Sequence, residues 1–381
     1  MNPSQKIADI QALRGVAILM VFIDHYIGRL PLIMPLVDGV RSYFMFGSGV
    51  DLFFAISGFV IMKSLFDRHE QIEHMKLDRS EFASFWKNRI YRLSPAAWFW
   101  ALVGIGVASG SSPLFEKYDV LHAIEGAITA VLGVANVYWA DCFSHLGEPL
   151  QQCGNQDINS YYWTLSLEEQ FYLLASVIGL FLGYRFLAMI AVIGIVAQAL
   201  HPRPFFGWFF FFRTDAICYG VLLYGFSRTR GYLRAGQWLC RWWVKAPLSM
   251  LAFLIMVTSL SAFSTTFIAP PTIGIALTGL MAGIIVLIAS YDRGLLGGGF
   301  VKRIFVWIGE RSYSIYLLHL PVLLLIGAII VWFHFDWNNF GLWEDLITGI
   351  VAISTILVIA NASYLFLEKP FMRRVRGNTP S

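Results

Sequence analysis

Residues 10–30, IQALRGVAILMVFIDHYIGRL, are long and apolar enough to cross a membrane and so indicate the fold class of this chain. A bilayer core about 30 Å thick requires about 20 predominantly apolar residues in a helix. The stretch also carries Arg14, Asp24 and His25, and ionisable side chains at this depth are costly and point to function. No small-residue cleavage site follows it, so we expect a retained first transmembrane helix and not a signal peptide.

The composition of the 381-residue chain excludes a soluble globular protein. Hydrophobic residues make up 57% of the chain, charged residues only 14%, and the mean hydropathy is +0.63. Soluble domains usually carry about 25% charged residues, so lipid must solvate much of this apolar surface. The net charge of +4 is small, and the basic residues are gathered in short loops. This pattern is typical of a membrane protein and fits it better than a nucleic-acid-binding surface, so we expect no nucleic-acid partner.

Eleven apolar segments along the chain are candidates for membrane helices. We therefore expect an all-α integral membrane protein without a long linker or a soluble appendage. The candidate spans are residues 10–30, 44–65, 93–110, 121–140, 162–183, 187–200, 206–226, 247–264, 272–290, 313–333 and 344–366.

Loop charges indicate how these segments cross, because basic loops remain in the cytoplasm. Eleven crossings would place the basic loop 228–245 outside, whereas ten crossings return it to the cytoplasm. We expect segment 121–140, which contains His122 and Glu125, to be re-entrant or buried instead of crossing. The predicted fold is a bundle of about ten transmembrane helices plus this segment, with both termini cytoplasmic. The basic stretches are residues 63–92, 228–245, 293–311 and 373–376.

The cysteines and histidines show no metal-binding pattern. The four cysteines form no C-x-x-C pair, and the chain has no H-E-x-x-H motif, so we expect no metal site. Loop 141–160 is predicted to lie outside and contains Cys142 and Cys153. Outside the cytoplasm this pair can form a disulfide, but sequence alone does not fix the geometry, so a disulfide and two free thiols both remain open.

Arg14 and His25 share one face of the first helix. They are eleven residues apart, which is about three turns and roughly 16 Å. With Arg14 at the cytoplasmic end, His25 lies beyond the bilayer midplane. A neutral imidazole oriented by the carboxylate of Asp24 can serve as a general base near pH 7. The alternative is an arginine that snorkels to the interface and a structural histidine.

Two further pairs of polar residues occur in or near the second and third candidate spans. Asp51 and Ser57 lie in the apolar block 49–59, where small residues also permit close helix packing. Arg89 and Arg92 are spaced i, i+3 at a helix entry. They are either topogenic charges or a fork for phosphate groups, which guanidinium geometry suits.

Polar groups in two later spans complete the candidate set. Glu168 and Tyr172 are one turn apart in a helix that opens with two carboxylates, and Tyr313 and His319 lie together in a later span. An interfacial aromatic belt accounts for aromatics of this kind, but not for the paired carboxylates. The chain has no G-x-S-x-G elbow and no P-loop, so soluble serine-esterase and nucleotidase mechanisms have no support.

Taken in order, six blocks resemble the membrane acyltransferase 3 family, which includes bacterial O-antigen and exopolysaccharide O-acetyltransferases. The resemblance runs from about residue 7 to residue 371, so we expect residues 1–381 to form a single transmembrane domain of this family. We expect no C-terminal extracytoplasmic hydrolase-like domain, because the chain ends about ten residues after its last block. The blocks are Arg14-Gly15-Val16-Ala17 with His25, residues 49–59, the Arg89 and Arg92 pair, residues 163–172, residues 313–319 and Glu368-Lys369-Pro370.

The resemblance implies a multi-pass enzyme of the bacterial inner membrane. Its donor would be cytoplasmic acetyl-CoA, and its acceptor a hydroxyl of a surface glycan, such as lipopolysaccharide, or of a lipid-linked sugar outside the membrane. The acyl group is expected to be acetyl, and the oligomeric state stays open. Carried over residue by residue, the catalytic group would be His25. In the mechanism that we expect, Asp24 or Glu168 stabilises its imidazolium. The acyl-CoA would contact Arg14, Arg89 and Arg92, and the supporting residues would be Asp51, Ser57, Tyr172, Tyr313 and His319.

Two other classes of function compete with acyl transfer. A transporter or glycolipid flippase could use the same buried charges as a substrate pathway, but the sequence shows no internal repeat and no paired broken helices. A structural subunit of an envelope synthase is the weaker alternative, because it leaves the buried arginine and histidine of the first helix unexplained.

Overall fold

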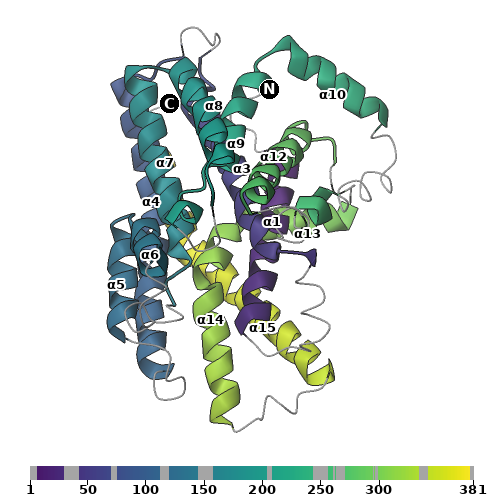
Figure 1. The fold of residues 1–381 in the computed structure, drawn as a ribbon. Helices are drawn as coiled ribbons and strands as arrows, with labels where there is room; N and C mark the ends of the chain where they lie inside the picture. The colour runs from purple at the N-terminus through teal and green to yellow at the C-terminus, as the bar shows by residue number, and fades with distance from the viewer. Residues whose placement is uncertain are drawn as a thin grey trace.

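The computed structural model describes most of the chain, and all regular structure in the described residues is helical (Figure 1). This confirms the predicted all-α class. The described residues are 7–29, 43–69, 75–111, 120–144, 158–203, 208–242, 256–260, 262, 271–294, 296, 299–333 and 342–377.

Within the described ranges, six helices are long and apolar enough to cross a membrane. The first helix, α1 (Ala8–Arg29), has 22 residues and is therefore about 33 Å long, enough to cross as well. These findings establish a helical membrane protein, whereas the count of ten crossings and the side of the termini stay predictions. The six candidate spans are Phe46–Phe66, Arg79–Gly110, Trp208–Ser227, Ile273–Ser290, Ser312–Ile330 and Leu346–Arg374.

Segment 121–140, which we expect not to cross, is broken in two. Helices α5 (Val120–Val131) and α6 (Ala135–Ser144) meet at Gly133, whose φ of +68° favours glycine. They are about 18 Å and 15 Å long, so neither alone reaches across the hydrocarbon core.

The break between α5 and α6 is supported by polar side chains of helix α7 (Tyr162–Phe181). Gln170 donates to the Gly133 carbonyl at 2.9 Å, and the Ala135 N–H donates to the Ser166 hydroxyl at 3.1 Å. Non-helical backbone at membrane depth requires protein partners of this kind. Side chains of one neighbouring helix therefore stabilise the interruption.

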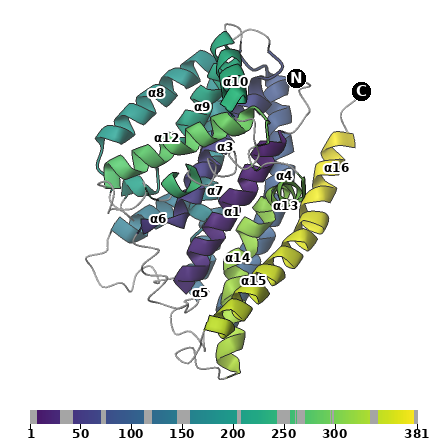
Figure 2. The same ribbon diagram turned by 90° about the vertical axis from the view of Figure 1, so that its right-hand side faces the viewer.

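Helix α1 packs among α13 (Gly299–Glu310), α3 (Gly49–Phe66) and α14 (Ser312–Trp332) (Figure 2). The crossing with α13 uses Gly15 and Gly309. A β-carbon on Gly15 would lie 2.3 Å from the Phe305 carbonyl oxygen, and one on Gly309 would lie 1.8 Å from the Gln11 carbonyl oxygen. Only glycine permits this approach, which fixes the rotation of α1 and hence the direction of its polar side chains.

A second close crossing joins α3 to α9 (Asp215–Ser227). A β-carbon on Gly58 would lie 2.2 Å from the Ile217 carbonyl oxygen, and one on Gly220 would lie 2.3 Å from the Ala55 carbonyl oxygen. Gly58 therefore permits close helix packing, as the sequence analysis considered for the small residues of block 49–59.

Helix α4 (Arg79–Ser111) carries Arg89 and Arg92 in its N-terminal part. Its first turn is capped by Asp78, which accepts hydrogen bonds from the Ser80 and Glu81 N–H groups at 2.7 and 2.8 Å. These bonds lower the pKa of Asp78, the one with Glu81 having the largest effect. The stabilising contribution of the cap is therefore present at neutral pH and is lost as the pH falls through this lowered value.

The remaining helices enclose this core or lie at its ends. Basic helices α10 (Arg230–Trp242) and α16 (Lys369–Gly377) lie toward one end of the bundle, the end at which α1 begins (Figure 2). The others are η1 (Phe46–Ser48), α8 (Tyr184–Leu200), η3 (Trp208–Phe210), α12 (Pro271–Ser290), α15 (Leu342–Ser363) and the π-helical turn η5 (Tyr364–Glu368).

The crossing of α1 and α13 predicts that Gly309→Ala lowers the Tm of the protein purified in detergent. Overpacking of this kind typically costs about 1–3 kcal/mol. Gly106→Ala on α4 is the matched control, because a β-carbon there meets nothing within 4 Å. Since alanine is favoured over glycine inside helices, the control should unfold at the same or a higher temperature. An unchanged Tm for Gly309→Ala would contradict the crossing.

Candidate functional site

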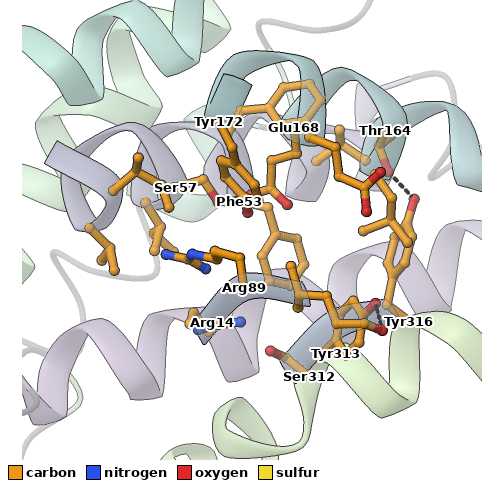
Figure 3. Close-up of a pocket in the computed structure, with 18 of the residues that line it drawn as sticks. Arg14, Phe53, Ser57, Arg89, Thr164, Glu168, Tyr172, Ser312, Tyr313 and Tyr316 are labelled. Atoms are coloured by element: carbon orange, nitrogen blue, oxygen red, sulfur yellow. Dashed lines mark hydrogen bonds between the residues drawn. The ribbon is translucent and has the colours of Figure 1, made fainter. Parts of the chain in front are cut away.

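A cavity of about 80 Å³ lies between helices α1, α3, α4, α7 and α14 (Figure 3). Five helices far apart in the sequence contribute to its wall. Polar groups line it from several sides, which is unusual for the interior of a helical membrane protein. The lining includes Arg14, Ser57, Arg89, Arg92, Thr164, Glu168, Glu169, Tyr172, Ser312, Tyr313 and Tyr316.

Three arginines meet at this cavity, as the sequence predicts for Arg14, Arg89 and Arg92. The Arg89 guanidinium lies 4.8 Å from the centre of the Tyr172 ring, a cation–π contact. The Nε atoms of Arg14 and Arg92 are buried and have no hydrogen-bond partner in the described part of the chain. Within those same residues, none of the three arginines forms an ion pair within 4.0 Å. Since buried charge is costly without a partner, the arrangement suits an anionic ligand.

Helix α7 and helix α3 bring a carboxylate and a hydroxyl to the same cavity. The Ser57 hydroxyl donates a hydrogen bond to the Glu168 carboxylate. Glu168 and Tyr172 lie one turn apart on α7, and Figure 3 shows Ser57, Glu168 and Tyr172 around the space that Arg14 and Arg89 also border. The structure thus gathers seven of the eleven predicted site residues at one cavity, Tyr313 being the seventh.

Sequence reasoning missed four polar residues of the cavity wall. Thr164, Glu169, Ser312 and Tyr316 line it, and all but Ser312 lie in blocks that the resemblance includes. The Ser312 hydroxyl is buried and has no hydrogen-bond partner among the described residues. The spacing of Thr164 and Glu168, four residues apart on one helix face, was the signal available for Thr164. For Ser312 the sequence carried none.

His25 and His319 lie against each other and outside the cavity wall. Their Nδ1 and Nε2 atoms are 2.8 Å apart, and their rings are stacked with centroids 4.9 Å apart. His319 is completely buried, and its Nδ1 lies 2.6 Å from the Tyr316 carbonyl oxygen. Tyr316 therefore joins the two places, because its side chain lines the cavity and its carbonyl holds His319.

The structure does not bring together the three predicted catalytic residues, His25, Asp24 and Glu168. Glu168 lies with the arginines, while the Asp24 carboxylate faces Gly47, where a β-carbon would lie 3.2 Å from it. Neighbouring residues on a helix do not face each other, so Asp24 is poorly placed to orient His25. The described partner of the His25 Nδ1 atom is His319.

Asp51 belongs to a buried cluster of ion pairs and not to the cavity. Its Oδ1 lies 3.6 Å from the Arg213 Nε, and the neighbouring pair Arg203 and Asp215 is 3.0 Å apart. Asp51 is only 2% exposed, and Arg213 also stacks over the Phe210 ring at 4.4 Å. Two cations and two anions balance here, so the cluster ties α3 to the start of α9.

Cys142 is disulfide-bonded in the structure. Of the two alternatives left open by the sequence, a disulfide and two free thiols, the first therefore applies to Cys142. Cys153, its predicted partner, lies outside the described residues. In the part of the chain that the structure describes, no three His, Cys, Asp or Glu side chains are grouped so that they could hold a metal ion.

The buried cluster predicts that Asp51→Asn destabilises the protein by about 3–5 kcal/mol, because it leaves Arg213 buried without its anion. Asp67→Asn is the control, since it breaks the partly exposed pair with Lys63 at the other end of the same helix. That change should cost at most about 1 kcal/mol. Thermal unfolding in detergent compares the two variants, and equal losses would contradict the assignment.

Comparison with known proteins gives a match to one family. The sequence model described as an acyltransferase domain, Acyl_transf_3, matches residues 7–361. The O-acetyltransferase OatA of Staphylococcus aureus is 24% identical over 392 residues, which cover 90% of this chain and 58% of that protein. The putative peptidoglycan O-acetyltransferase YrhL of Bacillus subtilis is 27% identical over 357 residues, covering 84% of this chain and 50% of YrhL.

The peptidoglycan O-acetyltransferase OatA of Listeria monocytogenes is 23% identical over 357 residues, covering 85% of this chain and 51% of that protein. The chain thus spans between half and three fifths of the length of these relatives, and no solved structure matches it. The match to the family model covers nearly the whole chain and confirms the resemblance seen in the six sequence blocks. This chain belongs to the acyltransferase 3 family.

Proposed function

We propose that this chain is a membrane-bound O-acetyltransferase, which moves an acetyl group from cytoplasmic acetyl-CoA to a hydroxyl of a cell-envelope glycan outside the membrane. One observation carries the proposal. Helices α1 and α14 connect a cavity lined by three arginines, none ion-paired among the described residues, to the His25–His319 pair, and His25 lies about three helical turns beyond Arg14 on α1. An anion site and a base thus lie along one pair of helices.

The arginines are suited to the donor. Guanidinium groups bind phosphates through two parallel hydrogen bonds, and acyl-CoA carries several phosphate groups. Arg89 and Arg92 lie in the N-terminal part of α4, and Arg14 lies near the start of α1. In this proposal Arg89 and Arg92 hold phosphate, and Arg14 guides the acyl arm into the bundle.

His25 is suited to the acceptor, because it lies eleven residues beyond Arg14 on the same helix. It removes the proton of the acceptor hydroxyl, and the oxygen forms a bond to the acetyl carbonyl carbon. The carbon–sulfur bond then breaks, and the CoA thiolate leaves and takes up the proton from the imidazolium. Proton transfer by a positioned side chain typically contributes about 10²–10⁴ in rate.

Aromatic and hydroxyl side chains separate the cavity from His25. Phe53, Thr164 and Tyr316 line the cavity, and the Tyr316 hydroxyl lies 2.5 Å from that of Thr164 and 2.8 Å from the Tyr161 carbonyl oxygen. The acetyl end of the donor must move past this aromatic boundary to reach His25. The order of the residues along α1 therefore gives the direction of transfer, from Arg14 toward His25.

The names of the relatives support a glycan of the cell wall as acceptor. Two of the three are described as peptidoglycan O-acetyltransferases. A multi-pass position in the bacterial inner membrane, with ten crossings and both termini cytoplasmic, would leave the His25 end of α1 facing this glycan. The disulfide at Cys142 supports a position outside the cytoplasm for the end of α6, because disulfides persist in oxidising surroundings.

Replacement of His25 by alanine should abolish transfer of radiolabelled acetyl from acetyl-CoA to soluble peptidoglycan fragments by the purified protein. His201→Ala, at an exposed position, is the control and should keep full activity. Unchanged transfer by His25→Ala would refute the general-base role. Movement of glycan without consumption of acetyl-CoA would favour the flippase.

The arginine cavity predicts a change in donor affinity. Arg89→Ala should raise the KM for acetyl-CoA about tenfold or more, because a charge-assisted hydrogen bond contributes about 1.5–3 kcal/mol. The KM of Arg89→Lys should lie between those of the wild type and Arg89→Ala, since lysine keeps the charge but cannot form two parallel hydrogen bonds to a phosphate. Arg303→Ala removes an exposed arginine from α13 and should leave the KM unchanged. Equal KM values in all four proteins would exclude the donor site.

A further inference from the structure

The hydrogen bonds of His319 determine which of its nitrogens carries a proton. Its Nδ1 lies 2.6 Å from the Tyr316 carbonyl oxygen, and a carbonyl can only accept. The hydrogen is therefore on Nδ1 of His319, and in the neutral ring the lone pair is on Nε2. A doubly protonated ring would instead place a positive charge on a completely buried side chain.

The same reasoning then fixes His25. Its Nδ1 is 2.8 Å from the His319 Nε2, which in the neutral pair is an acceptor. The His25 Nδ1 must donate, because two lone pairs at this distance would repel each other. A neutral imidazole has one hydrogen, so the lone pair of His25 is on Nε2.

Pro321 and Tyr161 hold His319 in this position. Pro321, inside α14, has no N–H to donate to the carbonyl four residues earlier, that of Leu317. The Tyr161 hydroxyl donates to this carbonyl instead, at 2.5 Å. The Tyr161 ring lies edge-on to His319, with centroids 5.2 Å apart. Tyr161 thus satisfies the carbonyl that Pro321 leaves without a donor, and its ring also restricts the position of the His319 imidazole.

We infer that His319 is a positioning residue that sets the tautomer of His25, so that Nε2 of His25 presents the lone pair to the acceptor hydroxyl. The inference rests on the proposed function. When Nε2 takes the hydroxyl proton, the hydrogen on the His25 Nδ1 stays in place and still donates to the lone pair of the neutral His319, so the positive charge is held on His25. The proton then passes from Nε2 to the leaving thiolate, so no group is consumed.

Two amide replacements separate this role from a structural one. In His319→Gln the side-chain oxygen can occupy the place of Nε2 and accept from His25. In His319→Asn the shorter amide can reach the place of Nδ1 and bond the Tyr316 carbonyl, but it cannot reach His25. We expect His319→Gln to stay within about tenfold of wild-type kcat and His319→Asn to lose about 10²-fold or more. The KM for acetyl-CoA should be unchanged in both, because the donor cavity is elsewhere.

The outcomes are distinct. A role in holding α14 alone would make His319→Asn as active as His319→Gln or more active, and that result would overturn the inference. Substituting exposed His201 by Gln and by Asn controls for general effects of the amides and should change neither constant. Full activity of His25→Ala would instead remove the proposed function itself.

A spectroscopic measurement on the unaltered protein covers the case in which neither variant folds. Nitrogen-15 NMR of histidine-labelled protein, with the signals assigned by their loss in His25→Ala, reports which ring nitrogen is protonated. We expect a protonated Nδ1 and an unprotonated Nε2 for His25 when both rings are neutral. The opposite assignment would overturn the inference.

Discussion

The need of every buried polar group for a partner inside a membrane governs this structure, because no water is present in the hydrocarbon core to supply one. The interrupted backbone at Gly133 is satisfied by Gln170, and the carbonyl freed by Pro321 is satisfied by Tyr161. Asp51 and Arg213 neutralise each other. The arginines of the cavity differ from Arg213, since within the described residues none of them forms an ion pair within 4.0 Å. We propose that this site binds an anion that arrives from outside the chain.

Helix α1 connects this anion site to the proposed base. Glycines allow it to pack directly against α13, which fixes its rotation about its own axis. The directions in which Arg14 and His25 project are therefore fixed as well. Helix α14 runs beside it and supplies Tyr316 to the cavity and His319 to the histidine pair. The geometry of the site is thus set by two neighbouring helices, of which α1 is held against α13 by close backbone contacts.

Much of this arrangement could be predicted from sequence, and the reasons differ between residues. The helical class follows from composition, and the shared face of Arg14 and His25 follows from helical spacing alone. The ordered sequence blocks also placed Arg89, Glu168 and Tyr172 in one site. Contacts between distant segments could not be derived in this way. His25 and His319 are 294 residues apart, and no local pattern pairs them, so the sequence instead suggested Asp24 as the partner. Ser312 lacks any charge or motif that would mark it.

We propose that donor and acceptor react from opposite sides of the membrane. The most direct test of this proposal reconstitutes the protein in liposomes of known orientation, with radiolabelled acetyl-CoA on one side and peptidoglycan fragments on the other. We expect labelled glycan only when acetyl-CoA is on the side of the basic helices α10 and α16 and the glycan is on the side of the His25 end of α1. Transfer that occurs only with both substrates on the same side would contradict the proposal.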